Sequence, residues 1–242
     1  MRQSPLIEPE IIDLGPGFYS KEEYEDCLTK LDQIGRWLGG DRATFVAMQK
    51  INPSPRSILD VGCGGGEFTI RLAQQYPKAC IVGIDLNPQA IEFAKKRLAL
   101  TQNPPTNLIF KIQNQKQLEE DKSYDVVMTT LVCHHMTDDE LVEFLKQACR
   151  IAKQRVILND LHRHAIAYYF FKVASPLFFR NRLVQHDGLV SIKRSFDRKE
   201  WVRALEQTGL APSQYNISWH WAFRWIVEIY CEEKAFCFQQ TA

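Results

Sequence analysis

The chain alternates between short apolar runs and longer stretches with helical spacing. Five runs have the length and composition of buried strands, and they lie at residues 56–61, 80–85, 108–112, 124–130 and 156–161. Helical stretches follow the first, second and fourth of these runs. Strands that are separated by helices pair in parallel, so this order predicts a parallel sheet with helices on both faces.

Polar residues mark the beginnings of the helical stretches. Three pairs have the spacing of a capping box, and these are Ser20 with Glu23, Thr137 with Glu140, and Asp197 with Glu200. Asn87-Pro88 supplies an N-cap and a proline at the first helical position of another helix. Two more helices are expected at 41–50 and 67–76. Residues 213–219 and 224–231 look like two strands joined by a short turn, which makes them antiparallel.

Residues 162–196 interrupt the alternation of strands and helices. Ala165–Phe179 holds twelve apolar residues in fifteen. This composition fits either a pair of core-packing helices broken at Pro176 or a hydrophobic lid over an aromatic or lipid-like molecule. Residues 180–203 carry seven Lys/Arg against three acids, which is typical of a solvated face and is also compatible with an anionic ligand or a membrane surface.

The length of 242 residues is enough to bury a sizeable core, and we expect a single domain over 1–242. We divide it into an N-terminal helical cap (1–52), a core (53–161), a helical insertion (162–196) and a C-terminal helix with a hairpin (197–242). The net charge of +1 gives no electrostatic reason to expect a nucleic-acid partner. Seven scattered cysteines favour reduced thiols in a cytoplasm. We find no signal region and expect no integral membrane segment.

The most specific chemical signal is the turn after the first strand. Residues 58–66 read ILDVGCGGG, and the next strand ends in Asp85. Glycines allow a ligand to approach the backbone where a Cβ would collide. An acid at the end of the following strand can bind both hydroxyls of a ribose. The two features together predict a site for a nucleoside-containing cofactor.

The residues around this turn decide between cofactors. A dinucleotide fingerprint needs a third Gly or Ala where this chain has Glu67 or Thr69, depending on the register. A glutamate at the helix start would also repel a pyrophosphate. The Walker A pattern does not fit either, because no Lys-Ser/Thr pair follows these glycines. An acid before the glycines suits a cationic ligand, and S-adenosylmethionine carries both an ammonium and a sulfonium.

Three segments resemble the class I S-adenosylmethionine-dependent methyltransferases, most closely their small-molecule branch with quinone and natural-product enzymes. They are ILDVGCGGGEF (58–68), VGIDLNPQAIEFAKKR (82–97) and YDVVMTTLVCHHM (124–136). The resemblance implies an α/β fold of the Rossmann-like methyltransferase type. Its sheet is doubly wound, seven-stranded and mostly parallel, with helices on both faces and a C-terminal antiparallel hairpin. It also implies S-adenosyl-L-methionine as the cofactor.

The resemblance assigns cofactor contacts to residues at the ends of the strands. These are Asp60, Gly62, Gly64, Gly66, Asp85, Leu86, Asn114, Gln115, Thr130 and Leu131. Asp60 would orient the turn and meet the methionine ammonium, Asp85 would accept the ribose hydroxyls, and Leu86 would lie against the adenine. Family members commonly carry Asp where this chain has Asn114. An amide oxygen can still accept a hydrogen bond from the adenine amine, but without the charge.

The sequence says less about the identity of the methyl acceptor than about the cofactor. The chain lacks the Asn/Asp-Pro-Pro-aromatic motif of nucleobase- and glutamine-methylating enzymes. Thr130 replaces the first acid of the catechol-type Mg²⁺ site, although Asn159-Asp160 resembles the rest, so we expect no catalytic metal.

Methyl transfer to a phenol or enol needs a base with a pKa near neutrality, and histidine is the natural candidate. His135 follows the fourth strand, His162 follows the fifth, and His186 lies in the insertion. We take these three as candidate bases, although capping or structural hydrogen bonds are an alternative for each. The expected reaction is O-methylation of a hydroxylated aromatic or polyketide-like small molecule. C-methylation of a quinone or isoprenoid-type precursor, or binding of the cofactor without catalysis, stays open.

Overall fold

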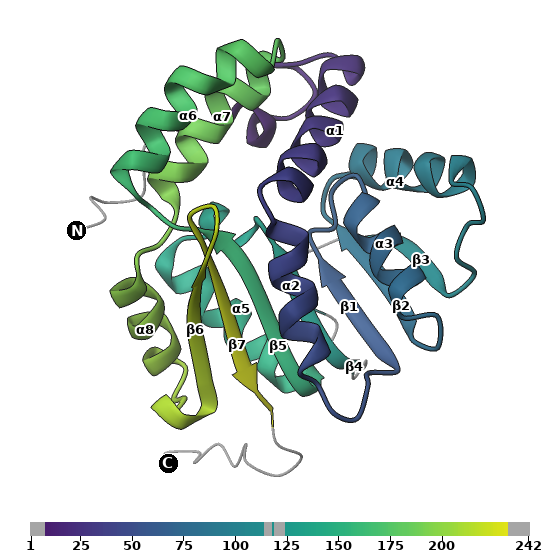
Figure 1. Cartoon of the computed structure of the whole chain (residues 1–242), viewed down its shortest axis with the longest axis vertical. Helices are drawn as coiled ribbons and strands as arrows, with labels where there is room; N and C mark the ends of the chain where they lie inside the picture. The colour runs from purple at the N-terminus through teal and green to yellow at the C-terminus, as the bar shows by residue number, and fades with distance from the viewer. Residues whose placement is uncertain (1–7, 114–117, 119–123, 232–242) are drawn as a thin grey trace.

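One sheet of seven strands runs through the described part of the chain, with the strand order β3-β2-β1-β4-β5-β7-β6 (Figure 1). The computed structural model describes residues 8–113, 118 and 124–231. The strands are β1 (Ser57–Val61), β2 (Cys80–Asp85), β3 (Leu108–Ile112), β4 (Tyr124–Thr130), β5 (Ala152–Leu161), β6 (Tyr215–His220) and β7 (Arg224–Tyr230). The first five pair in parallel, and β7 pairs antiparallel with both β5 and β6. The predicted sheet with its C-terminal hairpin is confirmed.

Helices cover both faces of this sheet (Figure 1). One face carries α2 (Gly40–Gln49), α3 (Glu67–Gln75) and α4 (Pro88–Leu100), and the other carries α5 (Asp138–Ile151) and α8 (Arg198–Gln207). Neighbouring strand residues serve opposite faces, because side chains alternate along a strand. Ile58 of β1 packs with Ile70 and Ile91, whereas Leu59 packs in the cluster of Leu141 and Trp201.

Helices begin at the capping residues that the sequence indicated. Ser20, Thr137 and Asp197 each accept a hydrogen bond from the backbone of a glutamate three residues later, and that glutamate bonds back. These caps begin α1 (Lys21–Trp37), α5 and α8. The Asn87 side chain accepts a hydrogen bond from the Gln89 backbone at the start of α4.

A further layer lies over the carboxyl ends of the parallel strands. It consists of the short helix η1 (Ile11–Leu14), α1, α6 (Ala165–Phe178) and α7 (Arg182–Arg194), seen above the sheet in Figure 1. Tyr24 and Leu28 of α1 share an apolar cluster with Leu183 and Val184 of α7. Segments far apart in the sequence therefore cover the same edge of the sheet.

Helix α6 is one continuous helix rather than a pair of helices. The predicted break at Pro176 is wrong, since the helix continues to Phe178. A proline in the last turn removes only one hydrogen bond near the helix end. Its large apolar side chains face outward, and the exposed fractions of Ile166, Tyr169, Phe170, Val173 and Leu177 are 63–78%. Within the described residues, no helix is at once long and apolar enough to cross a membrane.

Candidate active site

A cavity of about 1060 Å³ lies where β1, β2 and β4 end, beneath η1 and α1. Its walls come from the glycine turn, the ends of these strands, the first part of α1 and the loop after β4. The polar and glycine residues of the wall include Asp60, Gly62, Gly64, Gly66, Asp85, Asn87, Gln113, Thr130 and His135. The topology therefore brings most of the predicted cofactor residues to one place.

The three glycines of the turn have two different roles. All three have positive φ, at 70° for Gly62, 52° for Gly64 and 73° for Gly66. A Cβ on Gly62 would lie 2.4 Å from the Val132 side chain, and one on Gly66 would lie 2.6 Å from the Phe110 ring. A Cβ on Gly64 would meet nothing closer than 3.7 Å. Packing and φ thus require Gly62 and Gly66, whereas Gly64 leaves free space at the cavity wall.

Asp85 connects the glycine turn to helix α4. One carboxylate oxygen accepts a hydrogen bond from Gly64 N at 2.9 Å, and the other accepts one from Asn87 N at 2.8 Å. Burial raises its pKa, and these two hydrogen bonds act in the opposite direction. Each carboxylate oxygen retains a lone pair for another donor. The arrangement suits a carboxylate that fixes the turn and also accepts hydrogen bonds from a ligand.

Asp60 is only 2% exposed and lies at the end of β1. The Thr69 hydroxyl donates a hydrogen bond to it at 2.6 Å. Burial raises the pKa of Asp60 to about 7, well above the ordinary value of an aspartate, because the buried carboxylate loses its hydration. A cationic group in the cavity would favour its ionised form.

The charge of the cavity wall selects the kind of ligand. The wall contains the acids Asp13, Asp32, Asp41, Asp60, Glu67, Asp85, Glu140 and Glu143, and one guanidinium, that of Arg97. Three guanidinium groups pair with four of these acids: Arg71 pairs with Asp32 and Asp41, Arg97 with Glu67, and Arg194 with Asp13. Acids therefore outnumber the guanidinium groups around the described wall. A pyrophosphate would be repelled here, and a cation would be attracted.

Three of the other predicted cofactor residues, Thr130, Leu131 and Leu86, line the cavity. The Thr130 hydroxyl is buried and has no hydrogen-bond partner in the described part of the chain, so it can still bond a ligand. Leu131 has a φ of 59° and also lines the cavity, as does the half-exposed Leu86. Asn114 and Gln115 lie outside the described residues.

Of the three candidate bases, only His135 lies on the cavity wall. Its Nδ1 bonds to Asp13 at 3.1 Å. His162 packs against Trp225, with ring centroids 4.7 Å apart. His186 forms ion pairs with Asp187 and with Glu8.

The sequence of the core matches a known family. Residues 54–173 fit the model of the family described as "Methyltransferase domain". The chain belongs to the class I S-adenosylmethionine-dependent methyltransferases. A malonyl-[acyl-carrier protein] O-methyltransferase of Legionella pneumophila is 34% identical over 113 residues, which are 47% of this chain and 37% of that protein. Ajmaline N-methyltransferase of Rauvolfia serpentina is 27% identical over 141 residues, 52% of this chain and 47% of that protein. The alignments thus span less than half of either relative.

Solved methyltransferase structures share the fold. The plantazolicin methyltransferase BpumL, in complex with a triazolic desmethylPZN analog and SAH, superposes with a TM-score of 0.69 at 16% identity, over 91% of this chain and 93% of that one. Magnesium protoporphyrin IX methyltransferase of Synechocystis, with bound SAM, has a TM-score of 0.60 at 16% identity, over 93% of this chain and 98% of that one. At such low identity these matches establish the methyltransferase architecture alone.

The cavity residues that come from the first 35 positions of the chain could not be recognised from local sequence patterns. Ile12, Tyr19, Tyr24 and Leu28 all line the cavity. The capping box at Ser20 gave the start of α1, and the apolar face of that helix was evident. No local pattern indicated that this face would close a cavity at the far edge of the sheet.

Proposed function

We propose that this chain transfers a methyl group from S-adenosylmethionine to a hydroxylated aromatic or polyketide-like small molecule. The observation that carries the proposal is the acidic cavity between the glycine turn, Asp60 and Asp85. When bound, S-adenosylmethionine supplies a methyl group on a positively charged sulfur that a nucleophile can displace. The wall residues fit a ligand with one sugar, two cationic groups and no phosphate.

Each cofactor residue has a chemical task in this proposal. Asp85 would accept the two ribose hydroxyls, and Asp60 would face the ammonium group. Leu86 would lie against the adenine, and Thr130 and Leu131 would contact the methionine part. Asn114 and Gln115 keep their predicted place beside the adenine, on the strength of the resemblance alone.

The acceptor would occupy the part of the cavity nearest His135. Ile12, Tyr19 and Met136 also lie in the wall and give it an apolar and aromatic lining. Holding donor and acceptor in line supplies much of the acceleration in such a displacement. His135, oriented by Asp13, would take the acceptor's proton in the metal-free protein.

Turnover with a panel of hydroxylated aromatics tests the proposal. We expect S-adenosylhomocysteine to form together with a product that is heavier by one methyl group. Replacing His135 with Gln should lower kcat by about 100-fold or more with little change in cofactor affinity. The matched control is His164→Gln, which alters a histidine that caps α6 and should keep full turnover.

Other outcomes of this assay identify the rival functions. A methyl group found on carbon, with an isoprenoid quinone precursor as acceptor, would favour C-methylation. Cofactor binding without release of S-adenosylhomocysteine to any acceptor would favour a binding module. Equal turnover by His135→Gln and the original chain would exclude His135 as the base.

Cofactor affinity should depend on pH through Asp60. Its pKa of about 7 lies above the ordinary value, so the carboxyl is largely protonated below pH 7 in the free protein. Binding of an ammonium requires the ionised form, so affinity should fall as the pH is lowered from 8 to 6. Below pH 7, binding should release a proton, which calorimetry in two buffers of different ionisation enthalpy detects. Asp60→Asn should abolish this dependence. Equal affinity at pH 6 and pH 8 would argue against contact between Asp60 and the ammonium.

A further inference from the structure

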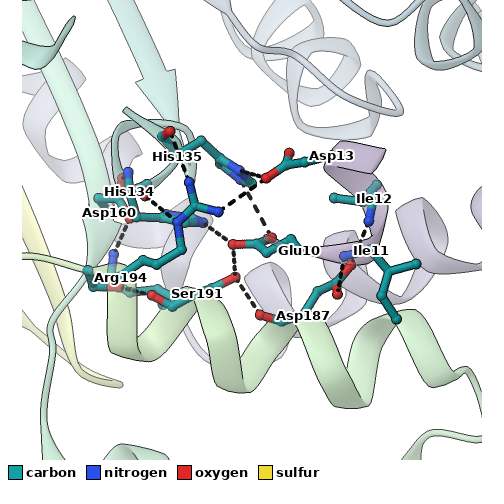
Figure 2. Close-up of polar contacts among 12 residues, drawn as sticks. Glu10, Ile11, Ile12, Asp13, His134, His135, Asp160, Asp187, Ser191 and Arg194 are labelled. Carbon is teal, nitrogen blue, oxygen red and sulfur yellow. Dashed lines mark hydrogen bonds and ion pairs between the residues drawn. The ribbon is translucent and has the colours of Figure 1, made fainter. Parts of the chain in front are cut away.

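A second group of polar side chains lies beside the cavity, where two segments far apart in the sequence meet (Figure 2). Glu10 comes from just before η1, and His134 and His135 come from the short helix η2 (Cys133–His135) after β4. One potential ligand atom from each of the three lies within 4.8 Å of the others. The exposed fractions of Glu10 and His134 are 3% and 2%, so bulk water screens the charges of these two side chains only weakly.

Carboxylates orient both imidazoles. His134 Nδ1 bonds to Asp160 at 2.7 Å, and His135 Nδ1 bonds to Asp13 at 3.1 Å. The opposite nitrogen, Nε2, then faces Glu10 in each ring, at 3.7 Å from one carboxylate oxygen for His134 and 3.7 Å from the other for His135. A histidine bound by a carboxylate through one nitrogen and free to coordinate through the other is the usual arrangement around protein-bound metal ions.

The contacts between Glu10 and the imidazoles are too long for hydrogen bonds. The Ser191 hydroxyl donates to Glu10 at 3.0 Å. This carboxylate therefore lies beside two nitrogen atoms with a gap between them, and its charge is poorly compensated.

The charges around the cluster favour an additional cation. Three further acids surround it, and these are Asp13, Asp160 and Asp187. Arg194 donates to Asp13 and to the backbone carbonyls of both histidines. Arg224 lies near Asp160. Carboxyl groups thus outnumber guanidinium groups around the cluster, which favours binding of an additional cation.

We propose that Glu10, His134 and His135 bind a divalent transition-metal ion of the Zn²⁺ type. The ion would take both Nε2 atoms and a carboxylate oxygen. In a tetrahedral site with bonds of about 2 Å, ligand atoms are about 3.3 Å apart. The two Nε2 atoms lie 3.7 Å from different oxygens of Glu10, and one ligand atom from each residue lies within 4.8 Å of the others, so a bound ion would draw the three side chains closer together. Two imidazole ligands favour Zn²⁺ or its neighbours over Mg²⁺ and Ca²⁺, which prefer oxygen.

This site differs from the catechol-type metal site considered in the sequence, which used the ends of the fourth and fifth strands as ligands. Asp160 here orients His134 instead. With three protein ligands, the ion would have at least one free coordination position, next to His135 on the cavity wall. In the loaded protein the ion would occupy the His135 Nε2 lone pair. A water in the open position would lose a proton to solvent more readily, and the resulting hydroxide would accept the proton of the acceptor in place of His135.

Metal titration of the full chain after dialysis against EDTA tests the proposal, with neither cofactor nor acceptor present. Co²⁺ should bind once per chain and give the visible absorption of a site with nitrogen and oxygen ligands, and Zn²⁺ should displace it. Glu10→Gln and His135→Gln should each weaken Zn²⁺ binding by about 100-fold. Asp13→Asn, a milder change at a half-exposed residue, should weaken it by about 10-fold. His186→Gln is the matched control, because His186 also pairs with acids but lies outside the cluster, and it should bind as the original chain does.

Three results would overturn the proposal. The original chain could show no saturable binding, in which case the cluster has a structural role alone. Glu10→Gln, His135→Gln and Asp13→Asn could bind as tightly as the original chain. Co²⁺ could show sulfur-to-metal absorption, which would place the ion on cysteines. Circular dichroism identifies any variant that fails to fold, and the remaining variants then decide. Because no cofactor is used, this test is independent of methyl transfer.

Discussion

Replacing Asp85 with alanine is expected to weaken binding of S-adenosylmethionine by about 2 to 3 kcal/mol, or about 30- to 150-fold. The change removes the acceptor of two hydrogen bonds to the ribose. It also leaves the backbone N–H groups of Gly64 and Asn87 without their present partner, so the turn that faces the ligand loses its support. Isothermal titration calorimetry with the original chain and the variant measures the difference.

Asp125 provides the matched control for Asp85. Its carboxylate also accepts two backbone hydrogen bonds, from Arg56 at 2.7 Å and from Ser57 at 3.2 Å, but at the opposite end of β1. Asp125→Ala should therefore lower stability and leave cofactor affinity unchanged. If the two variants bind the cofactor equally well, Asp85 does not hold the ribose.

Replacing Gly66 with alanine should lower the free energy of unfolding by about 2 to 4 kcal/mol. The new Cβ would lie 2.6 Å from the Phe110 ring and 2.7 Å from the Ala94 Cβ. Overpacking of this kind costs about 1 to 3 kcal/mol. The φ of 73° adds about 1 kcal/mol for a residue with a side chain. Chemical denaturation at equilibrium measures the loss.

Gly64→Ala is the comparison that separates packing from ligand contact. Its Cβ would have room, so we expect a stability loss of only about 1 kcal/mol from its positive φ. The added methyl group would project into the cavity, reduce the space for the ligand and should lower cofactor affinity. Equal stability losses in the two variants would contradict the division of roles among the glycines.

The sequence predicted the sheet well because its signals are local. The strands β2, β3 and β4 have the predicted bounds, and the capped helices begin where their capping residues indicate. Strand β5 begins at Ala152, four residues before the predicted start, because the polar residues Lys153, Gln154 and Arg155 interrupt the apolar pattern at its beginning. Local patterns also gave Asp60 and Asp85, since the end of a parallel strand is recognisable from sequence.

The residues that the sequence did not give depend on contacts between distant segments. Glu10 lies in a stretch without periodicity, yet it is buried against Ser191, 181 positions away. Asp187 accepts hydrogen bonds from Ile11 N and Ile12 N, which fixes the N-terminal segment against α7 (Figure 2). Such pairings leave no spacing that a single sequence reveals. The same holds for His135, whose position on the cavity wall distinguishes it from His162 and His186 only in three dimensions.

The central claim is that the cavity at the ends of β1 and β2 binds the methyl donor. A crystal structure of the chain with S-adenosylhomocysteine at saturating concentration tests it most directly. We predict that both ribose hydroxyls lie within hydrogen-bond distance of the Asp85 carboxylate and that the amino group faces Asp60. Density for the ligand at another place, or an empty cavity under these conditions, would contradict the account.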